Sequence, residues 1–267
     1  MPVRAARSRC WVRRSSRRRD PGGTGSTLAA LQVRPSERAY HRLAPPVIHR
    51  EPELSGRSII MLGSFNPQIF QPAWFSSQGL IREDEGENAN IGIVHPEIVA
   101  FSTESIQLEA QRERLAISTK SDTDAPEIIR DLAISVLSLL SHTPIHSLGI
   151  NTDGHYRADE REEFDRLRWV LAPPDVWGDS LRQPGLRVLT VQALRPDDRS
   201  GAIHATVEPS ARFTPHAVYI SVNDHFEVSP PGEAAIGARP AVEILTECWD
   251  DSHNRADAIV DQVLSLA

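Results

Sequence analysis

Two segments of this chain carry the same apolar stripe, 127 residues apart. In each segment the apolar side chains follow helical spacing, which places them on one face of a helix. They are Ile129, Leu132, Ala133, Val136, Leu137 and Leu140 in the first, and Ala256, Ile259, Val260, Val263, Leu264 and Ala267 in the second. Four consecutive residues, Val-Leu-Ser-Leu, are also identical in the two segments. The sequence therefore predicts two related helices and an internal duplication.

Each predicted helix follows a set of segments with strand-like character. Residues 58–65 predict a buried strand, a short apolar helix follows, and the alternation from 91 to 117 predicts further strands. The second half predicts a strand at 145–156, an acidic helix at 159–171, and strands at 186–194, 202–207, 217–228 and 241–249. The final helix is expected to begin near residue 254. The order strand, helix, three or four strands, helix thus occurs twice.

This order predicts the fold class. An all-parallel sheet needs strands and helices that alternate one to one, which is not the pattern here. We predict an α+β fold with a mostly antiparallel sheet and helices packed on one face, in one domain over 58–267 made of two related halves, 58–144 and 145–267. The element order resembles the saddle-shaped arrangement of TATA-binding-protein-like or helix-grip folds. That likeness implies a saddle and no particular activity.

The charge of the chain is unevenly distributed. Residues 1–57 hold 13 of the 29 Lys and Arg residues and four of the 36 acids, which leaves 16 basic and 32 acidic residues for the rest, a net charge of −16. An acidic body repels phosphate backbones and anionic lipid, so we expect no nucleic-acid binding by the folded domain and no membrane contact. The two cysteines predict neither a disulfide framework nor a cysteine zinc site. With no bilayer-length apolar run and no secretory core, we expect a cytoplasmic protein.

Residues 1–57 are rich in Arg, Pro, Ser and Gly and poor in apolar periodicity, which predicts a disordered extension. Three interpretations stay open for it. It is a basic arm that binds nucleic acid, a targeting peptide, or a translated upstream segment that results from a mis-assigned start. In the third case the true start lies near Met61.

The sequence lacks the common signatures of enzymes. It has no Walker phosphate loop, no Gly-x-Ser-x-Gly and no His-Glu-x-x-His, and Lys120 is its single lysine. The chemistry that remains lies in two clusters, Asp153 with His155 and Asp224 with His225, which together would form a metal-dependent or acid–base site. The alternative is structural, because Asn, Asp, Gly and His are favoured turn residues and both clusters match hairpin turns. We expect no cofactor and no resident metal.

A third candidate site is the apolar segment that contains Phe70, Trp74 and Phe75. Two prolines interrupt it, so its aromatic side chains are hard to bury on one helix face, and we expect them to contact a partner. The leading hypothesis is a non-catalytic module that binds a protein or a peptide. The alternatives are a hydrolase-like enzyme that uses the Asp/His clusters, and nucleic-acid binding through the Arg-rich arm. The sequence does not indicate an oligomeric state.

Overall fold

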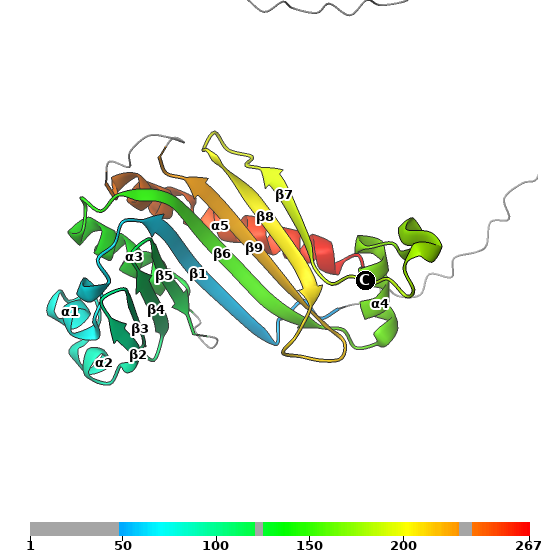
Figure 1. The fold of residues 1–267 in the computed structure, drawn as a ribbon, viewed down its shortest axis with the longest axis horizontal. Coiled ribbons are helices and arrows are strands. Elements are labelled where there is room, and N and C mark those ends of the chain that lie inside the picture. Colours follow the sequence, from blue (N-terminus) through cyan, green and yellow to red (C-terminus); the bar gives the residue numbers. More distant parts are fainter. Residues whose placement is uncertain (1–47, 121–124, 230–236) are drawn as a thin grey trace, which may run out of the picture. The chain divides into compact units, whose positions relative to one another are not determined.

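The structure, a computed structural model, describes residues 48–120, 125–229 and 237–267. Residues 1–47, which include most of the predicted N-terminal extension, lie outside the described residues. The described residues form one antiparallel sheet of nine strands together with helices, as Figure 1 shows. The prediction of an α+β fold with an antiparallel sheet is confirmed.

The sheet is built outward from a central pair of strands. Five strands belong to the first half: β1 (Leu54–Gly63), β2 (Asn90–His95), β3 (Ile98–Ser102), β4 (Ile106–Gln111) and β5 (Arg114–Thr119). Four belong to the second half: β6 (Ile145–Arg157), β7 (Leu189–Leu194), β8 (Gly201–Pro209) and β9 (Ala217–Glu227). Their order across the sheet is β2-β3-β4-β5-β1-β6-β9-β8-β7. In each half, therefore, the first strand lies innermost and the last strand pairs with it.

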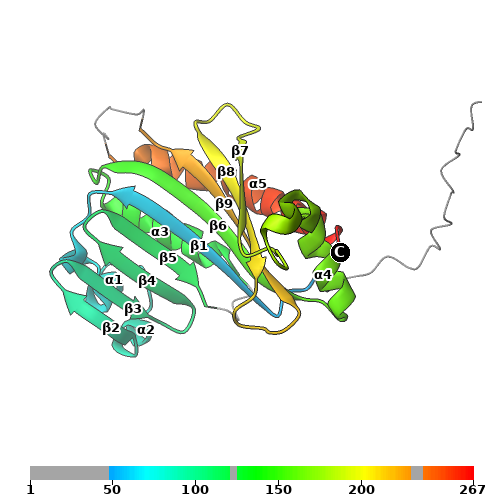
Figure 2. The same cartoon turned by 45° about the vertical axis from the view of Figure 1, so that its right-hand side comes forward.

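The helices pack on one face of this sheet, which we call the helix face (Figure 2). The other face, which no described helix covers, is the open face. The first half contributes η1 (Pro67–Ile69), α1 (Pro72–Ser77), α2 (Glu83–Glu87) and α3 (Glu127–Leu139). The second half contributes α4 (Arg161–Leu171), η2 (Pro174–Ser180) and α5 (Arg239–Leu264).

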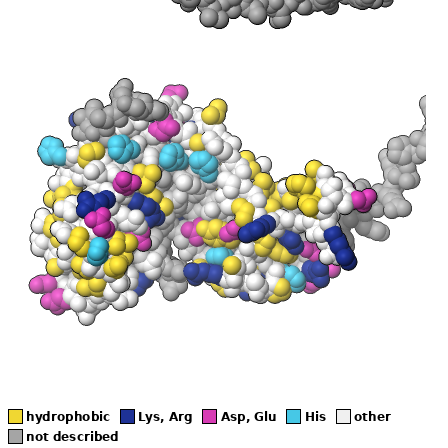
Figure 3. All heavy atoms as spheres, in the orientation of Figure 1, with side chains coloured by type: hydrophobic (Ala, Val, Ile, Leu, Met, Phe, Trp, Pro, Cys, Tyr) yellow, Lys and Arg dark blue, Asp and Glu magenta, His cyan; other side chains and the backbone are white. Residues whose placement is uncertain are grey.

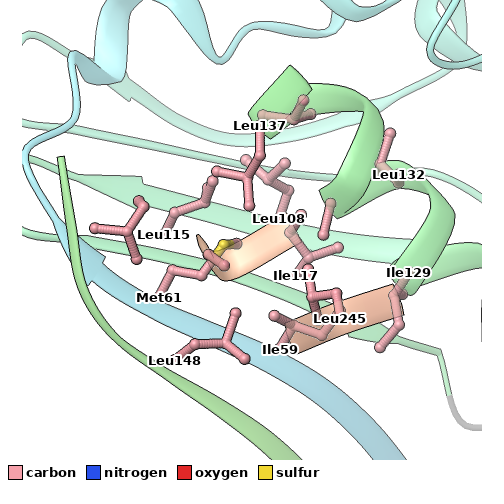
Figure 4. Packing of buried hydrophobic residues seen from close by; sticks show 14 of the residues in the cluster. Ile59, Met61, Leu108, Leu115, Ile117, Ile129, Leu132, Leu137, Leu148 and Leu245 are labelled. Atoms are coloured by element: carbon pink, nitrogen blue, oxygen red, sulfur yellow. The ribbon is translucent and has the colours of Figure 1, made fainter. Parts of the chain in front are cut away.

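The larger core lies between the first half of the sheet and α3. Figure 4 shows Ile129 and Leu137 of α3 directed toward Ile59 and Met61 of β1, with Leu245 of α5 beside Ile59. These side chains are at most 1% exposed. Burial of side chains of this size contributes about 1.5–3 kcal/mol each. The predicted apolar stripe of the first repeat helix is thus the stripe that faces the sheet.

Helix α5 corrects one prediction. The segment 241–249, predicted as a strand, forms the first half of this helix, and the helix begins at Arg239 and not near 254. Its β-branched residues favoured a strand, but its buried residues recur at helical spacing: Ala241, Ile244, Leu245, Cys248 and Trp249. Pro240 occupies the first turn, where a missing N–H is tolerated.

The described fold begins earlier than residue 58. Ile48 is 1% exposed, and the backbone N–H groups of His49 and Glu53 donate to carbonyls of β6. Met61 lies inside β1 and is fully buried. A chain that started at Met61 would lack most of the strand that pairs with both β5 and β6.

Candidate functional site

The open face carries the candidate site. Figure 3 shows this face: its central part is mostly backbone and side chains that are neither hydrophobic nor charged. Two adjoining grooves lie on this face, one of about 770 Å³ over β1, β6 and β9, and one of about 350 Å³ over β3, β4 and β5. Gln107 and Ser118 line both grooves, so the two form one trough.

The trough is hollow because small residues form its floor. Gly56 and Ser58 of β1 pair with Asp153 and Asn151 of β6, and Ser118 of β5 pairs with Ser58. A side chain at Gly56 would meet the Asp153 carboxylate, since an added Cβ would lie 3.0 Å from its Oδ1. The carboxylate therefore lies over the glycine and faces the groove.

Asp153 and His155 project from β6 into the larger groove, with Tyr219 beside them on β9. Burial raises the pKa of Asp153, and burial lowers the pKa of His155. Burial also raises the pKa of the Tyr219 hydroxyl. Burial in each case disfavours the charged form of the side chain. Among the described residues, Asp153 has no hydrogen-bond or ion-pair partner within the usual distance.

His155 is held by a loop that follows β8. Its Nδ1 lies 2.9 Å from Oγ of Ser210, and the same Oγ accepts hydrogen bonds from the backbone N–H groups of Arg212 and Phe213. The His155 ring also contacts the rings of Tyr219 and Phe213, at 4.8 and 5.5 Å between centroids. The hydrogen bond to Ser210 and the two ring contacts therefore fix the orientation of the His155 ring, which is 8% exposed.

The mouth of the larger groove is charged. Glu208 and Arg212 line it on one side and Lys120 lines it on the other. With Asp153, the groove therefore presents two carboxylates and two cations from these residues. It matches a dipolar ligand better than one of a single charge sign.

The two predicted Asp/His clusters do not come together. Neither is a hairpin turn: both lie inside long strands, β6 and β9. Asp224 is directed to the helix face, where it contacts Arg195 and Arg255. His225 is on the open face, but six residues along β9 from Tyr219, which is about 20 Å for an extended strand. Among the described residues, no three His, Cys, Asp or Glu side chains are grouped closely enough to hold a metal ion.

The apolar segment that was expected to contact a partner is part of the core. Phe70 and Phe75 are fully buried, and Phe75 contacts Phe101 of β3 with ring centroids 5.5 Å apart. Trp74 is half-buried against the same cluster. Pro72 starts α1 after a turn, and this change of direction lets both phenylalanines face the sheet.

Several residues of the groove were not predicted: Tyr219, Glu208 and Arg212. Strand alternation in 217–227 does place Tyr219 on the face opposite Val218 and Ile220. What the sequence does not state is which strands are neighbours. The pair Tyr219–His155 joins strands that are far apart in the chain, and the pair Tyr219–Glu208 depends on the pairing of the consecutive strands β8 and β9.

The chain matches no protein-family model and no curated protein sequence. None of the helices in the described residues has the length and apolar character needed to cross a membrane.

Proposed function

We propose that this protein is a non-catalytic binding module and that its open sheet face receives a segment of a protein or peptide. The observation that carries the proposal is the trough itself: nine strands support a hollow that helices do not cover and that hydrogen-bonding side chains line. Rigid sheet positions hold these side chains without a ligand, which lowers the entropic cost of binding.

Charge supports a protein or peptide over nucleic acid. Residues 58–267 carry the net charge of −16, and a negative field repels phosphate groups. The larger groove also offers few planar surfaces on which bases stack, since Tyr219 and the largely buried His155 are the aromatic rings among the residues that line it in the described part of the chain. Nucleic-acid binding remains a proposal for the Arg-rich arm alone, and deletion of residues 1–47 tests it.

The second candidate function is acid–base catalysis by Asp153 and His155 alone. One observation favours it: the two side chains face one groove, and burial shifts the pKa of the carboxyl upward and that of the imidazole downward. Such opposite shifts favour a carboxyl that keeps its proton and an imidazole that stays neutral, the protonation states of a general acid and a general base. Asp224 and His225 have no part in this candidate because they lie elsewhere.

The test is a peptide array probed with the wild-type protein and with two tryptophan variants. Ser118→Trp fills the floor shared by both grooves, whereas Ser138→Trp places the same side chain on the exposed side of α3. We expect peptides to be retained by the wild type and by Ser138→Trp, and binding by Ser118→Trp to fall at least about tenfold. Circular dichroism checks that both variants fold.

Two outcomes would change the proposal. Equal retention by all three proteins would place binding outside the trough. Cleavage of arrayed peptides by the wild type, and its loss in Asp153→Asn, would establish the catalytic candidate.

The duplication and the cytoplasmic location also belong to this proposal. Support for the duplication comes from the mirrored order of strands around β1 and β6, together with the stripe shared by α3 and the second half of α5. A saddle made of two related halves would offer the open face as one continuous platform. A crystal structure whose halves cannot be superposed by a rotation between β1 and β6 would remove the duplication. Cell fractionation tests the location.

A further inference from the structure

Each of the nine strands contributes, at the same register of the open face, one polar side chain that is not an acid, a lysine or an arginine. In the first half these are Asn90, Ser102, Gln107, Ser118 and Ser58, each paired with the next. In the second half they are Asn151, Asn223, His204 and Gln192, and Ser58 pairs with Asn151 to join the two sets. We call these nine residues the polar row. It crosses every strand of the sheet and contains no acid, lysine or arginine.

Charged side chains lie beside the polar row and not in it. Glu109, in the neighbouring register, pairs with Arg114 at 2.9 Å. Asp153 and Glu208 lie on the side of the polar row away from Glu109: Asp153 follows Asn151 along β6, and Glu208 follows His204 along β8. An exposed sheet face ordinarily carries charges at many positions, so a neutral line that crosses nine strands indicates a ligand without charge along that line.

Within the described part of the chain, few hydrogen-bonding groups of the polar row have a protein partner. The Nδ2 of Asn151 donates to the carbonyls of Ser58 and Gly149, at 3.3 and 3.2 Å. In the second half of the row, the Oδ1 of Asn223 is buried and has no donor within the described residues. It lies over Gly149, where an added Cβ would come within 3.0 Å of it. A buried acceptor without a donor is costly, so the amide gains from any ligand that lets it turn and pair.

We infer that the polar row binds the backbone of an extended peptide whose side chains are small and uncharged. The inference deepens the proposed function and rests on it. Side chains of Asn and Gln carry both a donor and an acceptor, as a peptide group does, and serine hydroxyls do the same. A charged side chain laid on the row would lose water without meeting an opposite charge.

The dimensions give the length of this peptide. Strands in a sheet are about 4.8 Å apart, so eight intervals between nine strands extend over about 38 Å. An extended peptide advances about 3.3 Å per residue, so about 11 residues span the row. The row itself contains no Trp, Tyr or Phe, so it lacks the flat apolar surface on which a sugar ring or a base would stack.

The experiment measures fluorescence anisotropy with labelled peptides of about twelve residues. One peptide is composed of Ser, Thr, Asn and Gly, and two others have the same length with Glu or Lys at alternate positions. A neutral oligosaccharide is the fourth probe. We expect the neutral peptide to bind at least about tenfold more tightly than the charged ones.

Two variants with the same chemical change locate the binding. Gln107→Glu puts a carboxylate in the polar row at the point where both grooves meet, and Gln262→Glu makes the same change on the exposed side of α5. We expect Gln107→Glu to weaken the neutral peptide by at least about tenfold and Gln262→Glu to leave its affinity unchanged. Urea unfolding of both variants checks that their folds are equally stable.

The outcomes separate the inference from the proposed function. If no peptide of any charge binds, the proposed function fails, and the inference fails with it. If charged peptides bind as tightly as the neutral one, or Gln107→Glu binds like the wild type, only the inference fails. Binding of the oligosaccharide in place of every peptide would overturn both.

Discussion

Asp224 shows how much one residue can depend on its partners. It is 1% exposed on the helix face, and its two carboxylate oxygens contact the guanidinium groups of Arg195 and Arg255. The Arg195 side chain is itself 1% exposed and also bonds Asp197, at 2.6 and 2.9 Å. Loss of Asp224 would leave both guanidinium groups with Asp197 as their shared carboxylate partner in this network, and incomplete compensation of buried charge costs more than the pair contributes.

We therefore expect Asp224→Ala to lower the free energy of unfolding by about 3–5 kcal/mol. The matched control is Glu243→Ala, which breaks the exposed pair with Arg239 on α5 and is expected to cost less than about 1 kcal/mol. Urea denaturation measures both. If Asp224→Ala costs as little as the control, the ion pairs of Asp224 with Arg195 and Arg255 do not stabilise the folded protein.

The same residue marks a limit of sequence analysis. Asp224 and His225 are neighbours in the chain, and as a candidate site they were expected to act together. Within a strand, however, adjacent side chains point to opposite faces, so Asp224 joins the charged network under the sheet and His225 joins the open face. Asp153 and His155, two positions apart, share a face for the same reason. The sequence predicted a strand over 217–228, so alternation alone could have separated the first pair, but the cluster was interpreted as a joint site or as a turn.

Among the elements, α5 contributes the most to the core. Its first half supplies Leu245 and Trp249 to the larger cluster, and its second half supplies Val260 and Leu264 to the smaller one under α4. The helix therefore takes part in both clusters: it lies behind β6 and β9 of the second half and packs against α3 of the first half (Figure 1).

Leu245→Ala tests this role of the helix. Leu245 is fully buried between α3 and the sheet, so we expect the cavity to lower the free energy of unfolding by about 2–5 kcal/mol. Leu139→Ala on α3 serves as the control, because Leu139 is 50% exposed and its truncation is expected to cost less than about 1 kcal/mol. Chemical denaturation followed by tryptophan fluorescence compares them. If Leu245→Ala and Leu139→Ala lower the free energy of unfolding equally, the packing of α5 on the core does not stabilise the fold.

Element prediction from the sequence succeeded where one face of an element is buried. The alternation of Ile106, Leu108 and Ala110 gave β4, and the stripe of Ile129 to Leu137 gave α3. It failed at 241–249, because Val, Ile and Thr favour strands in isolation while the packing of Leu245 and Trp249 on the sheet decides for a helix. The residues at the edges of the trough could not be predicted for a different reason: they come together only when particular strands pair, and the sequence does not indicate which strands do.

At the scale of the molecule, buried histidines link stability to pH. Burial lowers the pKa of His155, His225 and His253 below the ordinary value. In the unfolded chain these groups take up protons near their ordinary pKa of about 6.5, whereas in the folded state they resist protonation. The unfolded state therefore binds more protons below that pH, and stability must fall as the pH is lowered.

We expect the free energy of unfolding to be smaller at about pH 5.5 than at about pH 7.5. Burial raises the pKa of Asp153, so protonation of this carboxyl acts in the opposite direction. The measurement is therefore repeated in the Asp153→Asn variant, where the histidine effect is expected to be at least as large. His253→Gln should reduce the difference between the two pH values. Stability that stays constant or rises on acidification, in both backgrounds, would contradict the assignment.

Because α5 takes part in both cores, the two halves of this protein depend on the same helix. A chain that lost its last 29 residues, from Arg239 onward, would uncover the underside of the first half as well as the second. Because α5 belongs to the second half, the first half could not persist as a separate protein without another element to cover the residues that α5 now buries.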